Sequence, residues 1–219
     1  MMTEQLSQVK SLFMQFLHKK LHTYPHDYYY NVLTERYNDG LFYLELKKEI
    51  KARKPIYTKK KISLLSGIDI CKVNVKKVRE KFGHHFYRVK SSFLPEISVM
   101  LYRVLLGSYK AKLTLHFYKQ SLFCYTYSFA RVGKKDSQRI IKILYDKYLN
   151  NDSLNHKESF ILDETGNAIC IIEGVELSFN YICKGQNDIF DMITNDLEEK
   201  KYEKECQHIR ETKEIYNRL

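Results

Sequence analysis

The feature that most constrains this fold is a change of apolar spacing near residue 107. Beyond it, apolar residues alternate with polar ones over 111–117 and 122–129, on either side of a short polar turn. Alternation with a period of two predicts a pair of strands joined by that turn. Asp136 then opens a 3-to-4 apolar pattern that reaches Tyr148, and this pattern predicts a helix.

Three further apolar runs follow, at 159–162, 168–172 and 175–183. The first two flank the letters DETGN, which are typical of a turn. The order strand-strand-helix-strand-strand-strand therefore predicts an antiparallel sheet domain over 108–185 with one covering helix. The last segment, 186–219, carries a loose apolar stripe and predicts a long acidic amphipathic helix.

The first 107 residues predict a basic, mainly helical region. Thr3 is suited to cap a first helix, Pro25 to begin a second, and Leu94–Leu106 forms a further helical pattern. Lys47–Lys61 is nearly all charge and predicts an exposed arm. The predicted fold class is α+β, with the helical region at 1–107 followed by the sheet domain and the final helix.

Charge is divided unevenly along the chain. Residues 1–148 carry 29 Lys and Arg against 11 Asp and Glu, a formal +18. Residues 149–219 carry 8 against 15, a formal −7, which together give the net +11. Lys47–Lys90 alone holds 15 basic and 3 acidic residues. So dense a basic surface repels itself unless an anion lies against it, which indicates nucleic acid or an acidic subunit as partner.

A helix-turn-helix over 58–83 is the sharpest form of this hypothesis. Ser63 and Lys76 depart from the general pattern, but its small and apolar positions are matched by Ile62, Gly67, Ile68 and Val73. Lysine outnumbers arginine about three to one, which favours phosphate contacts over base recognition. The predicted polyanion-binding residues are Lys51, Arg53, Lys54, Lys59, Lys60, Lys61, Lys72, Lys76 and Arg79. The final helix could instead neutralise this surface, within one copy or between copies.

Few motifs indicate catalysis. The chain contains no Gly-x-Ser-x-Gly, no glycine-rich phosphate loop and no His-Glu-x-x-His. Asp39, Glu45 and Lys47 loosely match the Asp…Glu-x-Lys set of metal-dependent nucleases, with an unusually short spacing between the two carboxylates. We therefore expect no enzyme, no catalytic residue, no metal ion and no cofactor, with a nuclease as the remote alternative.

Five scattered cysteines, odd in number and without a Cys-x-x-Cys pair, predict reduced thiols in a cytoplasmic setting. No apolar run approaches the roughly 18 residues needed to cross a bilayer, and the amino terminus lacks the apolar core of a signal peptide. We expect protein subunits as partners, by self- or hetero-assembly, with either nucleic acid or an acidic subunit at the basic surface, and neither a membrane nor a small-molecule substrate. Three tyrosines on the predicted strands suit either a partner surface or the sheet core: Tyr125, Tyr127 and Tyr181.

These observations predict a non-catalytic binding and assembly protein, a structural subunit of a larger complex. A phage or mobile-element component is one setting for it, in which the chain would lie in the cytoplasm or inside a virion. The alternative is a helix-turn-helix DNA-binding regulator that reads DNA with Lys72, Lys76 and Arg79.

Overall fold

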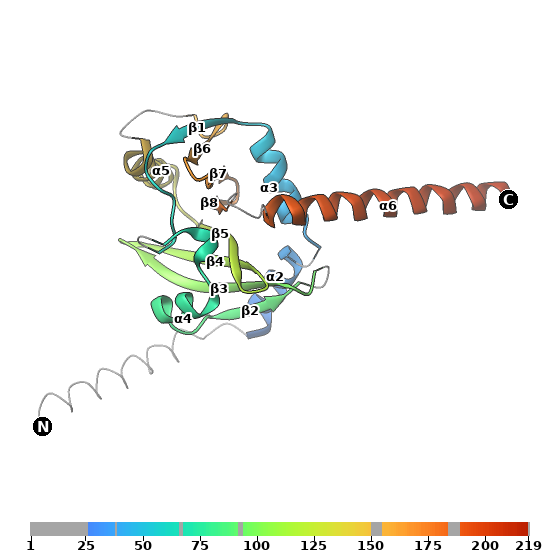
Figure 1. Cartoon of the computed structure of the whole chain (residues 1–219), viewed down its shortest axis with the longest axis horizontal. Helices are drawn as coiled ribbons and strands as arrows, with labels where there is room; N and C mark the ends of the chain where they lie inside the picture. Colours follow the sequence, from blue (N-terminus) through green and yellow to red (C-terminus); the bar gives the residue numbers. More distant parts are fainter. Residues whose placement is uncertain are drawn as a thin grey trace, which may run out of the picture.

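The computed structural model describes residues 26–37, 39–65, 68–91, 94–149, 155–183 and 189–218, and the helix predicted to begin at Thr3 lies outside them. The described chain is an α+β fold, built on one eight-stranded mixed sheet with helices on both faces (Figure 1). No helix among these residues is long and apolar enough to cross a bilayer.

The elements follow one another closely. The helices are α2 (His26–Tyr37), α3 (Leu41–Lys51), the 3-10 helix η1 (Ile70–Lys72), α4 (Val75–Phe82), α5 (Lys134–Leu149) and α6 (Ile189–Arg218). The strands are β1 (Lys54–Thr58), β2 (Tyr87–Lys90), β3 (Ile97–Leu106), β4 (Tyr109–Tyr118), β5 (Ser121–Ala130), β6 (Ser159–Asp163), β7 (Ala168–Glu173) and β8 (Glu176–Ile182). The strand order is β1-β6-β7-β8-β5-β4-β3-β2, and every neighbouring pair is antiparallel except β1 and β6.

The element order predicted for 108–185 is present as β4, β5, α5, β6, β7 and β8. The turn between β6 and β7 shows why the prediction succeeds. Asp163 accepts hydrogen bonds from the backbone N–H groups of Thr165 and Asn167, each at 2.9 Å, and Gly166 has a φ of 82° that glycine adopts without strain. The residue types that predict this turn are therefore the ones that form its hydrogen bonds and its left-handed backbone position.

The helix predicted at Leu94–Leu106 is wrong, because Ile97–Leu106 form β3, which pairs along its length with β4. All six residues from Ile97 to Tyr102 are buried. Val99 packs into the core on one face of the sheet and Met100 into the core on the other. A strand covered on both faces shows no alternation of apolar and polar residues, which is why its pattern resembles that of a helix.

The described part of the first 107 residues contains α2, α3, η1 and α4, and it also supplies three strands of the sheet. The exposed arm predicted at Lys47–Lys61 instead completes α3 and forms β1. β1 and β2 lie at the two edges of the sheet, and β3 lies next to β2. The sheet therefore continues across residue 107 through the hairpin of β3 and β4.

The helix-turn-helix predicted at 58–83 is not formed. The first helix of the motif is absent, because Thr58 ends β1 and 59–65 contains no helical residue. The second predicted helix is interrupted at Asn74, which has an extended backbone and forms a β-bridge with Ser121. Only its last part is helical, as α4, which ends as predicted at Gly83.

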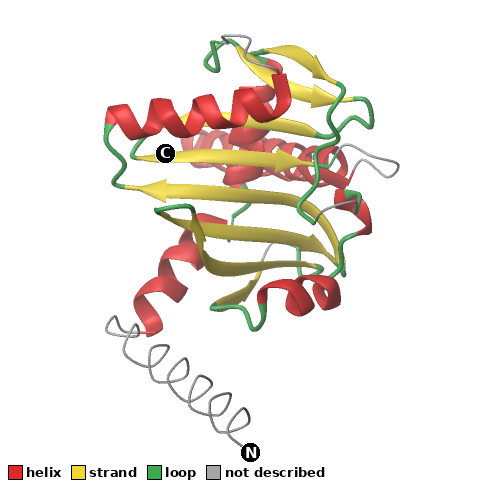
Figure 2. Ribbon diagram, turned by 90° about the vertical axis from the view of Figure 1, so that its left-hand side faces the viewer, coloured by secondary structure: helices red, strands yellow, loops and turns green. Residues whose placement is uncertain are grey.

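Two apolar clusters fill the two faces of the sheet. Figure 2 shows α5 crossing one face, and its cluster also takes in Val78 of α4 and the stacked rings of Tyr125 and Tyr181, whose centroids are 4.3 Å apart. Tyr127 packs against the same cluster, so the three tyrosines belong to the core. The opposite cluster joins α2, α3 and the start of α6, with Tyr43 at its centre.

The cysteines divide into two kinds. Cys124, Cys170 and Cys206 are free thiols, as predicted. Cys183 is disulfide-bonded, so the expectation of reduced thiols is wrong for this residue. Burial raises the pKa of Cys170 to about 11 and moves that of Cys124 still higher, so both buried thiols stay protonated and unreactive near neutral pH.

Candidate functional site

The outer part of α6 extends away from the core and is almost fully exposed. The helix has 30 residues, a length of about 45 Å, yet only its first turns pack against the sheet, through Phe190, Ile193 and Leu197. From 199 to 218 every side chain is exposed except that of Cys206, which is half-buried. Figure 1 shows this segment, here called the α6 arm, projecting away from the body with the carboxyl terminus at its far end.

Lys47 fixes the base of α6 on α3. Its side chain is only 9% exposed, and its ammonium donates to Asn195 Oδ1 at 2.7 Å and to Glu198 Oε2 at 2.9 Å. The hydrogen bond from Lys47 lowers the pKa of Glu198. Lys47 lies on the buried face of α3, between Tyr43 and Ile50 at helical spacing, and a lysine in such a position needs a polar partner.

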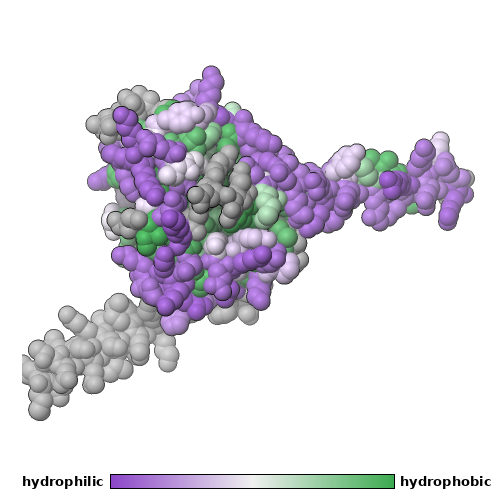
Figure 3. Space-filling view, in the orientation of Figure 1, coloured by the Kyte–Doolittle hydropathy of each residue, from purple (hydrophilic) through white to green (hydrophobic). Residues whose placement is uncertain are grey.

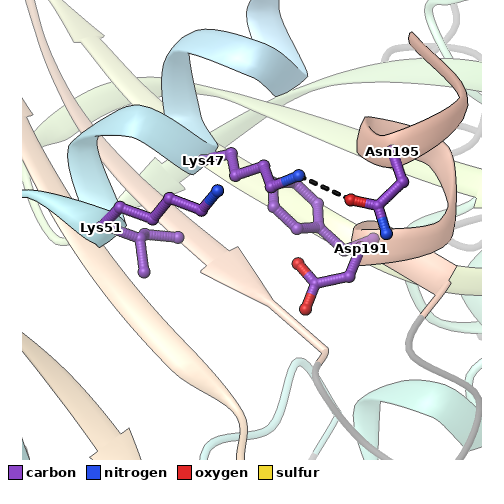
Figure 4. A pocket seen from close by; sticks show the side chains of 6 residues that line it. Lys47, Lys51, Asp191 and Asn195 are labelled. Carbon is purple, nitrogen blue, oxygen red and sulfur yellow. Dashed lines mark hydrogen bonds between the residues drawn. The ribbon is translucent and has the colours of Figure 1, made fainter. Parts of the chain in front are cut away.

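A pocket of about 270 Å³ lies where α3 and α6 meet (Figure 4). Small-molecule sites are usually larger, roughly 300–1,000 Å³, and more apolar. Elsewhere in the described residues, no group of three His, Cys, Asp or Glu could hold a metal ion. We interpret the pocket as a gap beside the Lys47 contact, not as a substrate site. It is lined by Lys47, Ile50, Lys51, Phe190, Asp191 and Asn195.

The residues of the nuclease hypothesis do not converge. Asp39 accepts a hydrogen bond from the backbone N–H of Leu41 at 3.0 Å, at the start of α3. Glu45 is exposed, whereas Lys47 is buried against α6. Two positions along an α-helix correspond to a rotation of about 200°, so these two side chains point to opposite sides. The geometry of a two-carboxylate metal site is therefore missing.

Arg53, unlike the other predicted polyanion-binding residues, is held inside the fold. Its guanidinium donates to the carbonyls of His156 and Ile171 at 2.7 and 2.6 Å and pairs with Glu49, leaving the side chain 8% exposed. Arg53 therefore ties the start of β1 to β7 and to the segment that precedes β6. The other predicted residues are exposed: Lys51, Lys54, Lys59, Lys60, Lys61, Lys72, Lys76 and Arg79.

The exposed basic residues fall into two groups, which the ion pair between Lys61 and Asp69 links. Lys59, Lys60 and Lys61 follow β1, the first strand of the sheet, and Lys61 pairs with Asp69 at 3.2 Å. The α4 helix instead packs on the seventh strand, β3, which lies about 29 Å from β1 at the usual strand spacing. Lys72, Lys76 and Arg79, here called the basic stripe, lie on η1 and α4, and Asp69, the partner of Lys61, immediately precedes η1.

The α6 helix of the same chain does not cover the basic stripe. Its base belongs to the cluster on one face of the sheet, whereas Val78 of α4 belongs to the cluster on the other. Within α6, eight acidic side chains are set against six basic ones, so the helix is only mildly acidic. In the part of the chain that the structure describes, no carboxylate pairs with the basic stripe.

Comparison with known proteins adds no assignment. No protein-family model, no curated protein and no solved structure matches this chain. A functional proposal must therefore be built on what the molecule itself presents. Three features carry it: the α6 arm, the Lys47 contact at the base of that arm, and the basic stripe on the far face of the sheet.

Proposed function

We propose that this chain is a non-catalytic binding and assembly protein, a structural subunit held in a larger complex by the α6 arm. The observation that carries the proposal is the exposure of large apolar side chains along this arm. In Figure 3 the arm is mainly hydrophilic, with a hydrophobic patch part-way along it. The exposed fractions are 69% for Tyr202, 64% for Ile209, 60% for Ile215 and 81% for Tyr216.

The energetics of isolated helices support this proposal. The arm extends a helix whose first turns are docked, and in water each added turn without tertiary contacts gains little, because helical stability in proteins comes mostly from packing of an apolar face. The arm has i,i+4 ion pairs between Lys200 and Asp196 and between Lys201 and Glu205, and such pairs contribute about 0.2–0.5 kcal/mol each. Burial of the apolar side chains by a partner would contribute more.

The basic stripe provides a second contact in this proposal. Its three cations are exposed and unpaired by carboxylates of the described chain, so they suit phosphates of a nucleic acid or an acidic subunit. Because the stripe and the α6 arm lie on opposite faces of the sheet, the two contacts do not exclude each other. A subunit that bridges a polyanion and other protein copies fits this arrangement.

Deletion of the arm after Glu198 tests the proposal. We expect the shortened chain to keep its urea-unfolding midpoint, because Lys47, Asn195 and Glu198 remain, and to lose association with other subunits. Mass by light scattering and retention of subunits on the tagged chain measure the association. A matched pair of point variants tests the apolar side chains without shortening the arm. Ile209→Ser should weaken association, whereas Glu211→Ser should not.

The proposal is wrong if the full-length chain is a monomer that retains no subunit. It is equally wrong if the deletion leaves association unchanged, because the arm would then be dispensable.

A further inference from the structure

We propose that the α6 arm pairs with the α6 arm of a second copy of this chain, as a parallel two-stranded coiled coil. The inference rests on the proposed function and deepens it, because it names the partner of the same arm.

The apolar side chains of the arm follow the spacing of a coiled-coil seam. Positions 202, 206, 209, 213 and 216 recur at intervals of four, three, four and three residues, and they are Tyr202, Cys206, Ile209, Lys213 and Tyr216. Alternating intervals of four and three define the d and a positions of a left-handed coiled coil. Four of these five side chains can pack against their counterparts in a partner helix.

The seam is a different face of α6 from the one that docks on the sheet. Phe190, Ile193 and Leu197 form the docking face, and at 100° per residue the seam lies roughly 150° around the helix from it. A second helix can therefore cover the seam without displacing the contact with α3. The part-buried hydrogen bond from Lys47 to Glu198 ties the base of the arm to α3 and leaves the seam open.

Charges beside the seam make the arm complementary to itself. Glu205 occupies a g position and Arg210 the e position five residues later. In a parallel pair in register, g of one helix faces e of the next heptad in its partner, so Glu205 of each copy faces Arg210 of the other. The twofold axis repeats this attraction, and the following pair, Thr212 and Asn217, is uncharged. This self-complementarity selects a second copy as the occupant.

Two polar features of the arm reduce the stability of the pairing but are compatible with it. Toward the base, Glu198 would face Glu203 of the second copy, but Glu198 is already bound by Lys47 at 2.9 Å. Lys213 occupies one a position, where its apolar stem packs in the seam while the ammonium reaches water, and a single polar a position favours one register and oligomeric state. The short seam predicts a dimer whose population rises with protein concentration.

Cysteine cross-linking tests the register. In the parallel pair Cys206 occupies an a position and faces Cys206 of the second copy, whereas the free thiols of Cys124 and Cys170 are buried. Mild oxidation of the full-length chain should give a covalent dimer on a non-reducing gel, and reductant should reverse it. Cys206→Ser should abolish the dimer. Moving the thiol outward, in the double variant Cys206→Ser/Lys204→Cys, should not restore it.

Charge exchange tests the pairing independently of the thiol. Glu205→Arg and Arg210→Glu each place like charges across the interface, and each should weaken self-association about tenfold in sedimentation experiments. The double variant, and a mixture of the two single variants, should regain it. Lys204→Glu makes the same charge change as Arg210→Glu on the outer side of the arm, and it should have no effect. Far-UV circular dichroism checks that each variant keeps its helix.

The outcomes separate this inference from the proposed function. A full-length chain that stays monomeric at every concentration overturns self-pairing, as does a dimer unaffected by charge reversal. If the monomer still holds a different subunit through residues 199–218, the proposed function stands and only the second copy is excluded. If nothing binds the arm, both proposals fail.

Discussion

His116 is a fully buried histidine among aromatic rings beneath α3. Phe42 stacks on it with ring centroids 5.4 Å apart, and the Tyr43 hydroxyl lies 2.9 Å from its Nδ1. Burial, and to a smaller extent the charge of Arg36, lowers the pKa of His116 to about 3. The ring is therefore neutral in the folded protein at every physiological pH, and its contacts are those of a packing group.

This lowered pKa predicts a pH dependence of stability. Between pH 6.5 and about 3 the unfolded chain binds a proton at residue 116 that the folded chain does not, so stability falls as the pH falls through this window. In His116→Phe that contribution is absent. As the pH falls below 6.5, the unfolding free energy of the variant minus that of the wild type should therefore increase by up to about 1.4 kcal/mol per pH unit. Urea unfolding at several pH values measures this, and parallel curves for the two proteins would contradict it.

Asp163 is a buried carboxylate that joins distant segments. One oxygen accepts from the backbone N–H groups of Thr165 and Asn167, each at 2.9 Å. The other accepts from the backbone N–H of Ile62 at 2.8 Å, which ties the chain after β1 to the end of β6. Because these are backbone donors in the protein interior, each needs an acceptor that the substitution of Asp163 would remove.

Replacing this carboxylate should cost more than an ordinary loop substitution. We expect Asp163→Ala to lower the unfolding free energy by about 3 kcal/mol or more, because several buried donors lose their acceptor together. Glu164→Ala, at the adjacent exposed position, should change it by less than about 0.5 kcal/mol. Equal effects in urea unfolding would show that the turn, and not the Asp163 carboxylate, carries the stability.

At the scale of the elements, α4 is a short helix that is anchored in the core and carries exposed cations on its outer side. Val78 is fully buried, the side chain of Asn74 accepts a hydrogen bond from the N–H of Lys77 at 3.0 Å, and Gly83 ends the helix. On the outer side Lys76 and Arg79 lie three positions apart and so share a face. A short, capped helix of this kind holds its cations at fixed positions, which favours contact with a regular array of phosphates.

Removal of the basic stripe tests that contact. The triple variant Lys72→Ala/Lys76→Ala/Arg79→Ala should weaken binding to duplex DNA of any sequence. It should also reduce the slope of log K against log salt by about 0.9 for each phosphate that the protein no longer neutralises. Fluorescence anisotropy at several salt concentrations measures both. The matched control removes three exposed lysines of α5: Lys134, Lys135 and Lys142.

If the α5 control loses as much binding as the stripe variant, net charge alone attracts the DNA and the stripe has no special role. Strong preference for one duplex over a scrambled one would also contradict the expectation, because lysine contacts to phosphate carry no sequence information.

At the scale of the whole molecule, strands are predicted most accurately from the sequence where a polar turn joins them to the next strand. The hairpins of β4 with β5 and of β6 with β7 are marked by polar turn residues, and the strand positions agree with prediction within two residues. β3 cannot be recognised in the same way because both of its faces are buried. β1 is hidden because an edge strand with Lys54 and Pro55 at its start resembles a charged linker.

The site residues show the same limit. Charge alone suggests that Lys47 and Arg53 are exposed, yet each is held inside by partners more than 90 residues away: Asn195 and Glu198 for Lys47, and the carbonyls of His156 and Ile171 for Arg53. Only the fold brings such partners together. For Lys47 the sequence does contain a signal, since this residue occupies an apolar position of α3 at helical spacing. The apolar pattern predicts the α6 helix itself. That only its first turns pack on the sheet cannot be seen in the sequence, because the packing depends on the positions of α3 and the strands.

The parallel pairing of β1 with β6 has a consequence for folding. Lys54 is opposite Ser159, so β1 has no neighbour in the sheet until about one hundred more residues have been added to the growing chain. Closing so large a loop carries an entropic cost and raises the contact order, which slows folding. We expect β1 to join last, after the antiparallel strands have formed, so that a nascent chain halted before residue 159 keeps this strand exposed to chaperones and proteases.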